Sequence, residues 1–190
     1  KFPKGTTKIH ESIAYSDFAL KRFFETASKQ EWYKNTLFVV VADHTSAEPT
    51  EAKFKTNVGK FRIPILFFDP SNPEMAGKNM KNLQQIDVMP SVLDYLNIDT
   101  KMISYGKSYQ SEKDFVVYYL DNIYHYISGD FYLAFDGKKS LGLYNFKNDE
   151  LLKTNLIKTE KAKAIEMEGF IKAYIQSFNE RLIGNKLTIQ

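Results

Sequence analysis

Two short apolar runs constrain the fold of this 190-residue chain more than any other feature. Residues 36–42 read TLFVVVA and residues 63–69 read IPILFFD, and neither run alternates apolar with polar side chains. Such a run suits a strand that is covered on both faces, as in a parallel sheet. Pro64 restricts the second run to a sheet edge or to the start of its strand, because proline donates no hydrogen bond to a neighbouring strand.

Helical patterns flank the two runs. Residues 8 to about 30 place apolar side chains at three- and four-residue spacings, which predicts an amphipathic helix. A second, shorter helix is predicted over residues 88–97, with Asp87 as its N-cap and Pro90 tolerated in its first turn. The order helix, strand, strand, helix predicts α/β layering over the first hundred residues.

The pattern changes after Gly106. Four short strands are predicted, at residues 115–122, 123–128, 130–137 and 140–146. Asp136 and Gly137 form a favourable hairpin turn, so the strands should pair as a small antiparallel sheet. A last helix is predicted over residues 160–183, with Thr159 as its cap and Gly184–Asn185 at its end.

Composition excludes several classes of protein. The net charge is 26 − 23 = +3, which is too small to indicate a nucleic-acid-binding protein. The chain has no cysteine, so disulfides and thiolate metal sites are excluded. No run approaches the roughly 20 apolar residues of a membrane span, and no signal peptide opens the chain. Because it starts at Lys1 without methionine, we expect it to be a piece of a longer protein.

Asp43 and His44 follow the first apolar run directly, where its strand should end. Adjacent side chains in a strand point to opposite faces, so the two could share a metal only if the chain is already turning. Thr45, Ser46, Glu48 and Pro49 favour such a turn. Carboxylate and imidazole both bind Zn²⁺ or Mn²⁺. In the simpler alternative, Asp43 only caps the turn and His44 only lies at a strand end.

Several segments, read in order, resemble one family. They are YSDFALKRFFETASKQEWYKNTLFVVVADHTS (15–46), FRIPILFFDP (61–70), QIDVMPSVLDYLNI (85–98), GKSY (106–109) and LYNFKNDELLKTNL (143–156). Together they resemble the alkaline phosphatase superfamily, and most closely its sulfatase and lipoteichoic-acid-synthase-like branch. Ser91 and Asn97 stand where that family usually has threonine and glycine.

The resemblance implies the C-terminal portion of an alkaline-phosphatase-like α/β sandwich. Residues 1–112 would be the C-terminal half of the α/β domain, with a parallel sheet carrying the metal centre at its strand ends. Residues 113–158 would be a small four-stranded antiparallel subdomain, and residues 159–190 a C-terminal helix.

The resemblance also implies two metal ligands in this chain and a catalytic nucleophile outside it. Asp43 and His44 would be metal ligands, with Mn²⁺ as the expected ion and Zn²⁺, Mg²⁺ or Ca²⁺ as alternatives. The nucleophile, a threonine in the transferases or a formylglycine in the sulfatases, would lie upstream of this chain. We therefore expect no catalytic nucleophile here and no activity from the chain alone.

The implied partners are an anionic phosphate or sulfate ester, lipid-linked or part of a glycan, and the N-terminal half of the same catalytic domain. The basic segment 53–62 could steer such a substrate, with Lys55 and Lys60 as candidate binding residues. The whole protein is expected outside the cytoplasm, in the periplasm or at the cell surface, and held to the membrane by segments outside this chain.

Three functions remain open at this stage. The first is a phosphoglycerol- or phosphoethanolamine-type transferase of the cell envelope. The second is a sulfatase that hydrolyses sulfate esters of glycans. The third is a non-catalytic module that binds glycans or envelope polymers through its many tyrosines, although these could equally cover the sheet. His125, in an alternating strand, is expected to be a half-exposed residue of that sheet.

Overall fold

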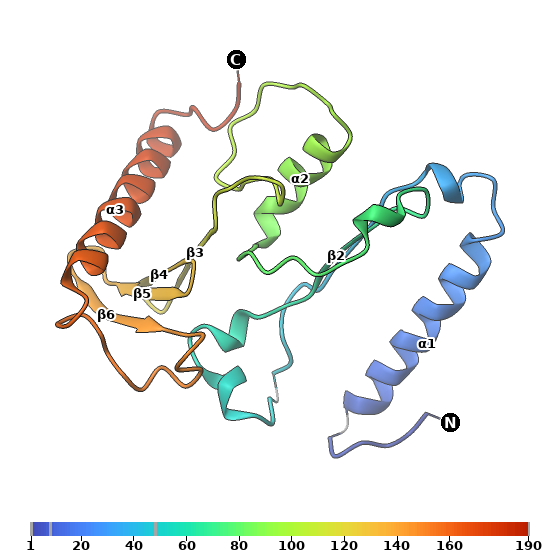
Figure 1. Ribbon diagram of the computed structural model, residues 1–190, viewed down its shortest axis with the longest axis horizontal. Helices are drawn as coiled ribbons and strands as arrows, with labels where there is room; N and C mark the ends of the chain where they lie inside the picture. Colours follow the sequence, from blue (N-terminus) through green and yellow to red (C-terminus); the bar gives the residue numbers. More distant parts are fainter. Residues whose placement is uncertain (1, 8, 48, 190) are drawn as a thin grey trace. The chain divides into compact units, whose positions relative to one another are not determined.

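The computed structural model describes residues 2–7, 9–47 and 49–189 (Figure 1). The helices in these ranges are α1 (Ile9–Ala27), α2 (Val88–Tyr95) and α3 (Lys161–Ile183). The strands are β1 (Phe38–Val41), β2 (Ile65–Phe68), β3 (Phe115–Leu120), β4 (Ile123–Ser128), β5 (Phe131–Phe135) and β6 (Ser140–Asn145). No described helix combines the length and the low polarity needed to cross a bilayer.

The chain forms two compact units. Unit 1 comprises residues 1–40 and 66–78, and unit 2 comprises residues 41–65 and 79–190. The α/β architecture and the four-stranded antiparallel sheet followed by a C-terminal helix confirm the predicted fold class. The predicted boundaries at residues 112 and 158 stay a prediction.

Unit 1 is built around the ring of Phe38. Its centroid lies 5.2 Å from the ring of Phe24 on α1 and 5.9 Å from that of Phe68 on β2. Trp32 and Tyr33, which follow α1, lie 6.2 and 5.5 Å from the same ring. Phe38 on β1 therefore packs against both α1 and β2, which explains the aromatic residue at this position.

Helix α1 confirms the amphipathic pattern, but it ends at Ala27, earlier than residue 30, and Lys8 lies outside the described residues. Part of its apolar face is exposed in this chain, including Ile13 at 52% and Phe23 at 50%. Ala27 is its buried residue, with 3% of its surface exposed.

The pairing of β1 with β2 differs from the expected parallel sheet. The N–H of Ala42 donates to the carbonyl of Pro64, and the ring of Phe38 stacks on that of Phe68. Moving four residues back along one strand therefore moves four residues forward along the other, which is an antiparallel register. Absence of alternation in these runs predicted strands correctly but carried no information on direction. All four β1 residues are half-buried.

In unit 2, β3 to β6 form an antiparallel meander in chain order. The first hairpin turns at Asp121 and Asn122, whose φ angles are 52° and 61°. Two successive positive φ values match the twist of paired strands, and these two residue types tolerate them. The last hairpin turns at Asp136–Gly137 as predicted, with a φ of 91° at Gly137.

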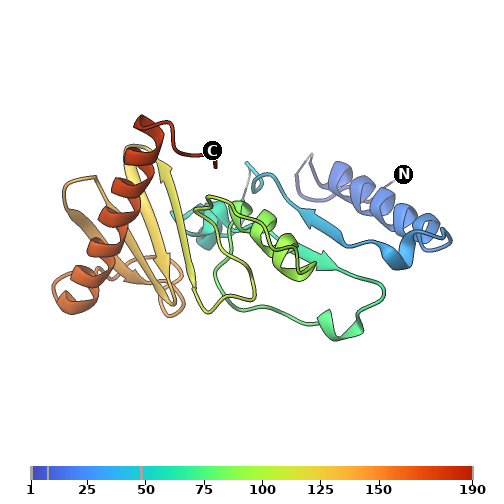
Figure 2. The same cartoon turned by 90° about the horizontal axis from the view of Figure 1, so that it is seen from above.

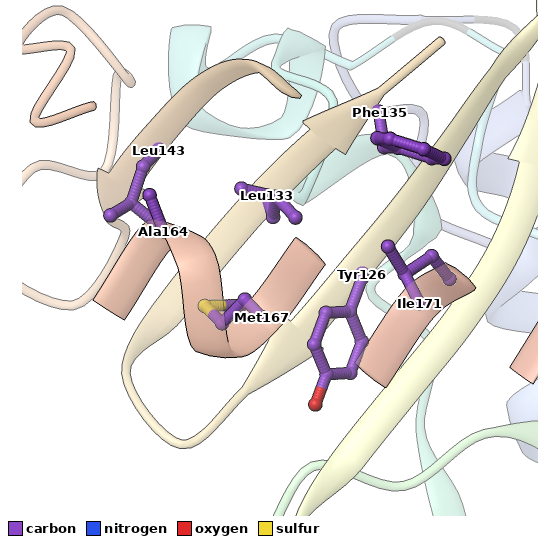
Figure 3. Close-up of a cluster of buried hydrophobic side chains, with 7 residues drawn as sticks. All are labelled: Tyr126, Leu133, Phe135, Leu143, Ala164, Met167 and Ile171. Atoms are coloured by element: carbon purple, nitrogen blue, oxygen red, sulfur yellow. The ribbon is translucent and has the colours of Figure 1, made fainter. Parts of the chain in front are cut away.

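The sheet is covered on both faces. Helix α3 lies against one face of the sheet (Figure 2), and its buried side chains pack against those of the strands (Figure 3). This core contains Tyr126, Leu133, Phe135, Leu143, Ala164, Met167 and Ile171. The other face buries Ile127, Tyr132 and Ala134, and Val58 of the basic segment packs there.

One predicted helix cap is confirmed in position and the other is wrong. Asp87 is the N-cap residue of α2 as predicted, but its side chain makes no cap bond, because its carboxylate is engaged by a buried lysine. Glu160, not Thr159, precedes the first turn of α3, and the hydroxyl of Thr159 donates to the carbonyl of Leu156. Helix α2 ends before Asn97, whose φ of 52° explains how asparagine can stand where the family has glycine.

Candidate functional site: the Asp–His turn

Residues 42–46, here called the Asp–His turn, leave the end of β1 and reverse the chain. The Asp43 Oδ1 accepts the backbone N–H of His44, the next residue, at 2.9 Å. Both side chains are open to solvent, with 88% of Asp43 and 77% of His44 exposed. The turn therefore satisfies the geometric condition for two adjacent side chains to face one ligand.

The imidazole of His44 is held in one tautomer. Its Nδ1 lies 2.8 Å from the carbonyl oxygen of Thr45. Because a carbonyl oxygen only accepts hydrogen bonds, Nδ1 must carry the hydrogen, and Nε2 keeps its lone pair in the neutral ring. A histidine that binds a metal is oriented in this way, through a hydrogen bond from its other ring nitrogen.

The free nitrogen of His44 faces the carboxylate of Asp43. Nε2 lies 3.4 Å from Asp43 Oδ2. Two lone pairs at this separation repel each other unless a proton or a cation lies between or beside them. The arrangement thus suits either a protonated imidazole in an exposed ion pair or a shared divalent cation.

The backbone of the Asp–His turn is anchored at two places. The side-chain amide nitrogen of Gln85 donates to the carbonyls of Ala42 and Asp43, at 2.9 and 3.0 Å. The hydroxyl of Thr45 donates to the carbonyl of Lys60 at 2.6 Å. Sequence reasoning missed Gln85, because nothing in its local pattern connects it to a turn more than forty residues earlier.

The donor set fits a divalent cation in part. A carboxylate and a neutral imidazole are ligands that Mn²⁺ and Zn²⁺ both accept. Among the residues that the structure describes, however, no group of three histidine or acidic side chains converges on one point. Asp43 and His44 could hold a cation only together with ligands from elsewhere.

The two candidate substrate lysines differ in their surroundings. Lys55 is exposed, whereas 32% of the Lys60 side chain is exposed. The Lys60 ammonium lies 4.0 Å from Asp121 Oδ2 and 5.7 Å from the centroid of the Phe61 ring. Lys60 is linked to the Asp–His turn through its backbone carbonyl, and Lys55 has no such link that the structure describes.

His125 is buried, with 2% of its surface exposed, so the expectation of a half-exposed residue is wrong. It faces the basic segment, and its Nδ1 lies 2.7 Å from the hydroxyl of Tyr132. Its ring stacks on that of Tyr118 at 4.6 Å, and the Tyr118 hydroxyl donates to the carbonyl of Asn57. Burial lowers the pKa of His125, and it raises the pKa of Tyr132 to about 12. This cluster attaches the basic segment to the sheet.

A sequence profile of the sulfatase family matches residues 5–98, which include the Asp–His turn and Gln85. The chain carries a sulfatase-family domain segment. This match confirms the resemblance to the sulfatase family, and the metal-ligand roles of Asp43 and His44 stay a prediction.

Curated relatives of this chain include lipoteichoic acid synthase of Staphylococcus aureus strain USA300. The two are 26% identical over 167 aligned positions, which cover 80% of this chain and 24% of the synthase. The synthase of strain COL matches equally. The chain thus spans about a quarter of the length of these relatives.

Solved structures share the fold. An alkaline phosphatase superfamily protein from Vibrio parahaemolyticus superposes with a TM-score of 0.72 and 21% identity, covering 100% of this chain and 47% of the other. A Bacteroides thetaiotaomicron structure from work on the metabolism of multiple glycosaminoglycans gives a TM-score of 0.64 and 16% identity, covering 86% and 43%. The first of these matches places the chain in the fold of the alkaline phosphatase superfamily.

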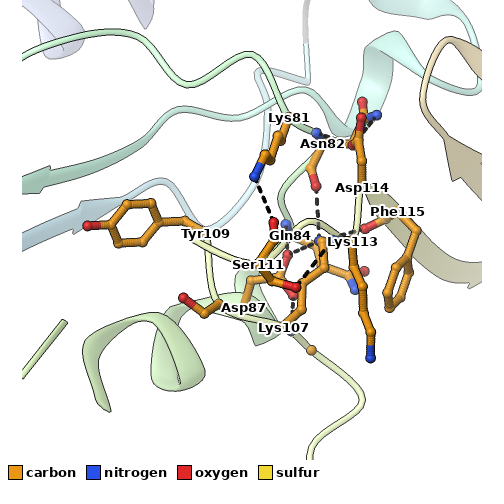
Figure 4. Close-up of polar contacts among 12 residues, drawn as sticks. Lys81, Asn82, Gln84, Asp87, Lys107, Tyr109, Ser111, Lys113, Asp114 and Phe115 are labelled. Carbon is orange, nitrogen blue, oxygen red and sulfur yellow. Dashed lines mark hydrogen bonds and ion pairs between the residues drawn. The ribbon is translucent and has the colours of Figure 1, made fainter. Parts of the chain in front are cut away.

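A buried ion pair holds Asp87, which ends the 3-10 turn that Gln85 begins. The Lys107 ammonium lies 2.7 Å from Asp87 Oδ2, and both side chains are almost fully buried, with 4% and 2% exposed. Figure 4 shows the surrounding contacts, in which the same ammonium also donates to the carbonyls of Asn82 and Phe115. The burial of Lys107 could not be predicted from the sequence of the GKSY segment.

Proposed function

We propose that this chain is the C-terminal part of the catalytic domain of a metal-dependent enzyme that transfers phosphorus-containing groups in the cell envelope. The substrate class would be phosphoglycerol- or phosphoethanolamine-type esters, lipid-linked or attached to a glycan. The nucleophile would come from residues outside this chain, so the chain alone would be inactive.

The observation that carries the proposal is the facing pair of donor atoms in the Asp–His turn. Asp43 Oδ2 and His44 Nε2 lie 3.4 Å apart, with the His44 ring fixed by Thr45 so that Nε2 keeps its lone pair. An isolated cap residue would need neither the fixed tautomer nor the exposed imidazole beside it. The match to the sulfatase family supports a cation as the shared ligand.

A divalent ion bound here, Mn²⁺ in our proposal, would neutralise the oxygens of an anionic ester and lower the pKa of the nucleophile. Asp43 would contribute negative charge to the binding of the ion, and His44 a neutral nitrogen donor. Lys55 and Lys60 would add positive charge near the ester and favour its approach. The parent enzyme would work outside the cytoplasm, anchored in a membrane by segments that are not in this chain.

A sulfatase is the second candidate, and the name of the matching family favours it. Matches to lipoteichoic acid synthase along 80% of the chain favour the transferase. A glycan-binding module would need exposed aromatic residues on the small sheet. Tyr119 on β3 is 57% exposed, whereas the burial of Tyr126 and Tyr132, at 4% and 1% exposed, favours a packing role for these two.

The test uses the full-length parent protein, purified as wild type and as the variants Asp43→Asn and His44→Gln. Bound manganese is measured by elemental analysis, and turnover is measured with a phosphoglycerol ester and with an aryl sulfate. We expect the wild type to bind Mn²⁺ and to act on the phosphorus ester. Both variants should lose Mn²⁺ and at least a hundredfold in turnover, as loss of a metal ligand predicts.

Glu51→Gln is the matched control, because Glu51 is a nearby exposed acid paired with Lys53 instead of with the turn. It should retain Mn²⁺ and turnover. Unchanged Mn²⁺ content and turnover in the Asp43 and His44 variants would overturn the proposal. Turnover of the sulfate ester without turnover of the phosphorus ester would indicate a sulfatase instead of a transferase.

A further inference from the structure

Gln85 makes an unusual pair of contacts with the Asp–His turn. Its single amide nitrogen donates one hydrogen to each of two consecutive carbonyls, those of Ala42 and Asp43. We propose that Gln85 is a positioning residue that fixes the peptide between the two candidate metal ligands. This inference rests on the proposed metal-binding function of the turn.

The side chains of Asp43 and His44 cannot position themselves by packing. Both are largely exposed, so their directions depend on the backbone that carries them. A rotation of the peptide that joins the two residues would increase the distance between Asp43 Oδ2 and His44 Nε2. Gln85 restrains the carbonyl on each side of the Asp43 α-carbon, which limits this rotation.

Gln85 is itself held by a rigid support. It begins a short 3-10 turn, Gln85–Asp87, and the carboxylate of Asp87 is buried. That carboxylate accepts the backbone N–H groups of Gln84 and Lys107, at 3.0 and 2.8 Å, and the Lys107 ammonium at 2.7 Å.

The small sheet contributes a further bond to this support. The side-chain oxygen of Gln84 accepts the N–H of Val117 on β3 at 3.0 Å. The turn that carries Gln85 is therefore tied to β3 on one side and to the Asp87–Lys107 pair on the other. Gln85 reaches the Asp–His turn from a base that has little freedom to move.

Glutamine is suited to this role by its chemistry. Its planar amide group supplies two N–H donors from one nitrogen, one for each carbonyl. A glutamate of the same shape can only accept, so it would place an anionic oxygen against two carbonyl oxygens. A leucine would fill a similar volume with no donor. Since Gln85 is exposed and belongs to neither buried core cluster, its loss should spare the fold.

The experiment measures Mn²⁺ affinity of the full-length parent protein by electron paramagnetic resonance titration, independently of turnover. The variants are Gln85→Glu and Gln85→Leu, with Gln110→Leu as control because Gln110 is an exposed glutamine outside the turn. We expect Mn²⁺ binding to weaken 10- to 100-fold in both Gln85 variants, as for other residues that orient metal ligands. Gln110→Leu should bind as the wild type, and the thermal unfolding midpoints of all variants should agree within about 3 °C.

Affinity within threefold of the wild type in both Gln85 variants would overturn the inference. A loss of affinity that matches a fall in the fraction of folded protein would overturn it equally, since the effect would then be structural. Failure of the proposed function has a different signature. In that case Asp43→Asn and His44→Gln would bind Mn²⁺ as the wild type does.

Discussion

Lys107 reaches its partners through the interior of unit 2, where its ammonium touches Asp87 and two backbone carbonyls. Lys107→Met should destabilise the chain by about 3–5 kcal/mol, because it leaves the Asp87 carboxylate buried without its countercharge. Urea unfolding followed by far-ultraviolet circular dichroism measures this change.

Lys21→Met provides the comparison. Lys21 pairs with Glu25 at 3.9 Å, and both side chains are mostly exposed. Its removal should change the free energy of unfolding by less than about 1 kcal/mol. Equal effects of the two substitutions would contradict the view that Lys107 acts through burial.

His125 should make stability depend on pH. Burial lowers the pKa of His125 in the folded chain below its ordinary value of 6.5. As the pH falls below 6.5, the unfolded chain takes up a proton that the folded chain does not, so stability is lost on that side and is fully present above it. The effect on the free energy of unfolding can reach about 1.4 kcal/mol per pH unit.

Urea titrations between pH 7.5 and pH 5.5 check this prediction. The wild type should lose more stability over this range than His125→Phe, which cannot take up a proton. Lys60, Asp121, Tyr118 and Tyr132 also surround the ring. Burial raises the pKa of both tyrosines above their ordinary value of about 10, far above this range. Identical pH dependence in the two proteins would refute the assignment to His125.

At the scale of elements, α3 depends on its buried face. Ile171 is fully buried at 0% exposed, between the helix and the four-stranded sheet. Ile171→Ala should cost about 2–5 kcal/mol, through lost apolar burial and the cavity that remains. Ile165→Ala, on the same helix but 74% exposed, should cost less than about 0.5 kcal/mol. Thermal unfolding of both variants compares them, and similar midpoints would show that α3 is not docked as described.

Sequence patterns predicted elements better than their relations. Strands β3 to β6 and the end of α3 at Gly184 follow from local residue chemistry, such as positive φ at Gly137. The antiparallel pairing of β1 with β2 is a non-local property, and the apolar runs look the same for either direction. The burial of His125 escaped prediction for the same reason, because it depends on Asn57 and Tyr118 from other parts of the chain.

The candidate site was predictable to a similar degree. Asp43 and His44 were identified from their place after an apolar run and from a family resemblance. Their anchors, Gln85 and the carbonyl of Lys60, were not predicted as anchors, because Lys60 was a candidate only for its side-chain charge and Gln85 only began a segment that resembles the family. Side chains that act on a distant backbone leave no periodic pattern, so only the folded chain identifies them.

At the scale of the whole molecule, the small sheet should stabilise residues that precede it. Gln84 bonds to the N–H of Val117, and Lys107 to the carbonyl of Phe115. A chain truncated after residue 112 should therefore lose amide hydrogen-exchange protection across residues 84–95, since it lacks both partners. Hydrogen exchange read by mass spectrometry tests this. Wild-type protection of α2 in the truncated chain would show that the first 112 residues fold without the sheet.

Aromatic residues are divided unequally between the two units. Trp32, the single tryptophan of the sequence, lies in unit 1 beside Phe38. Ten of the twelve tyrosines, all from residue 95 onward, lie in unit 2. Tryptophan emission thus reports on unit 1 alone, while tyrosine ellipticity near 275 nm is dominated by unit 2. One sample carries two intrinsic optical probes, and a single denaturation experiment can reveal whether the units melt together or in succession.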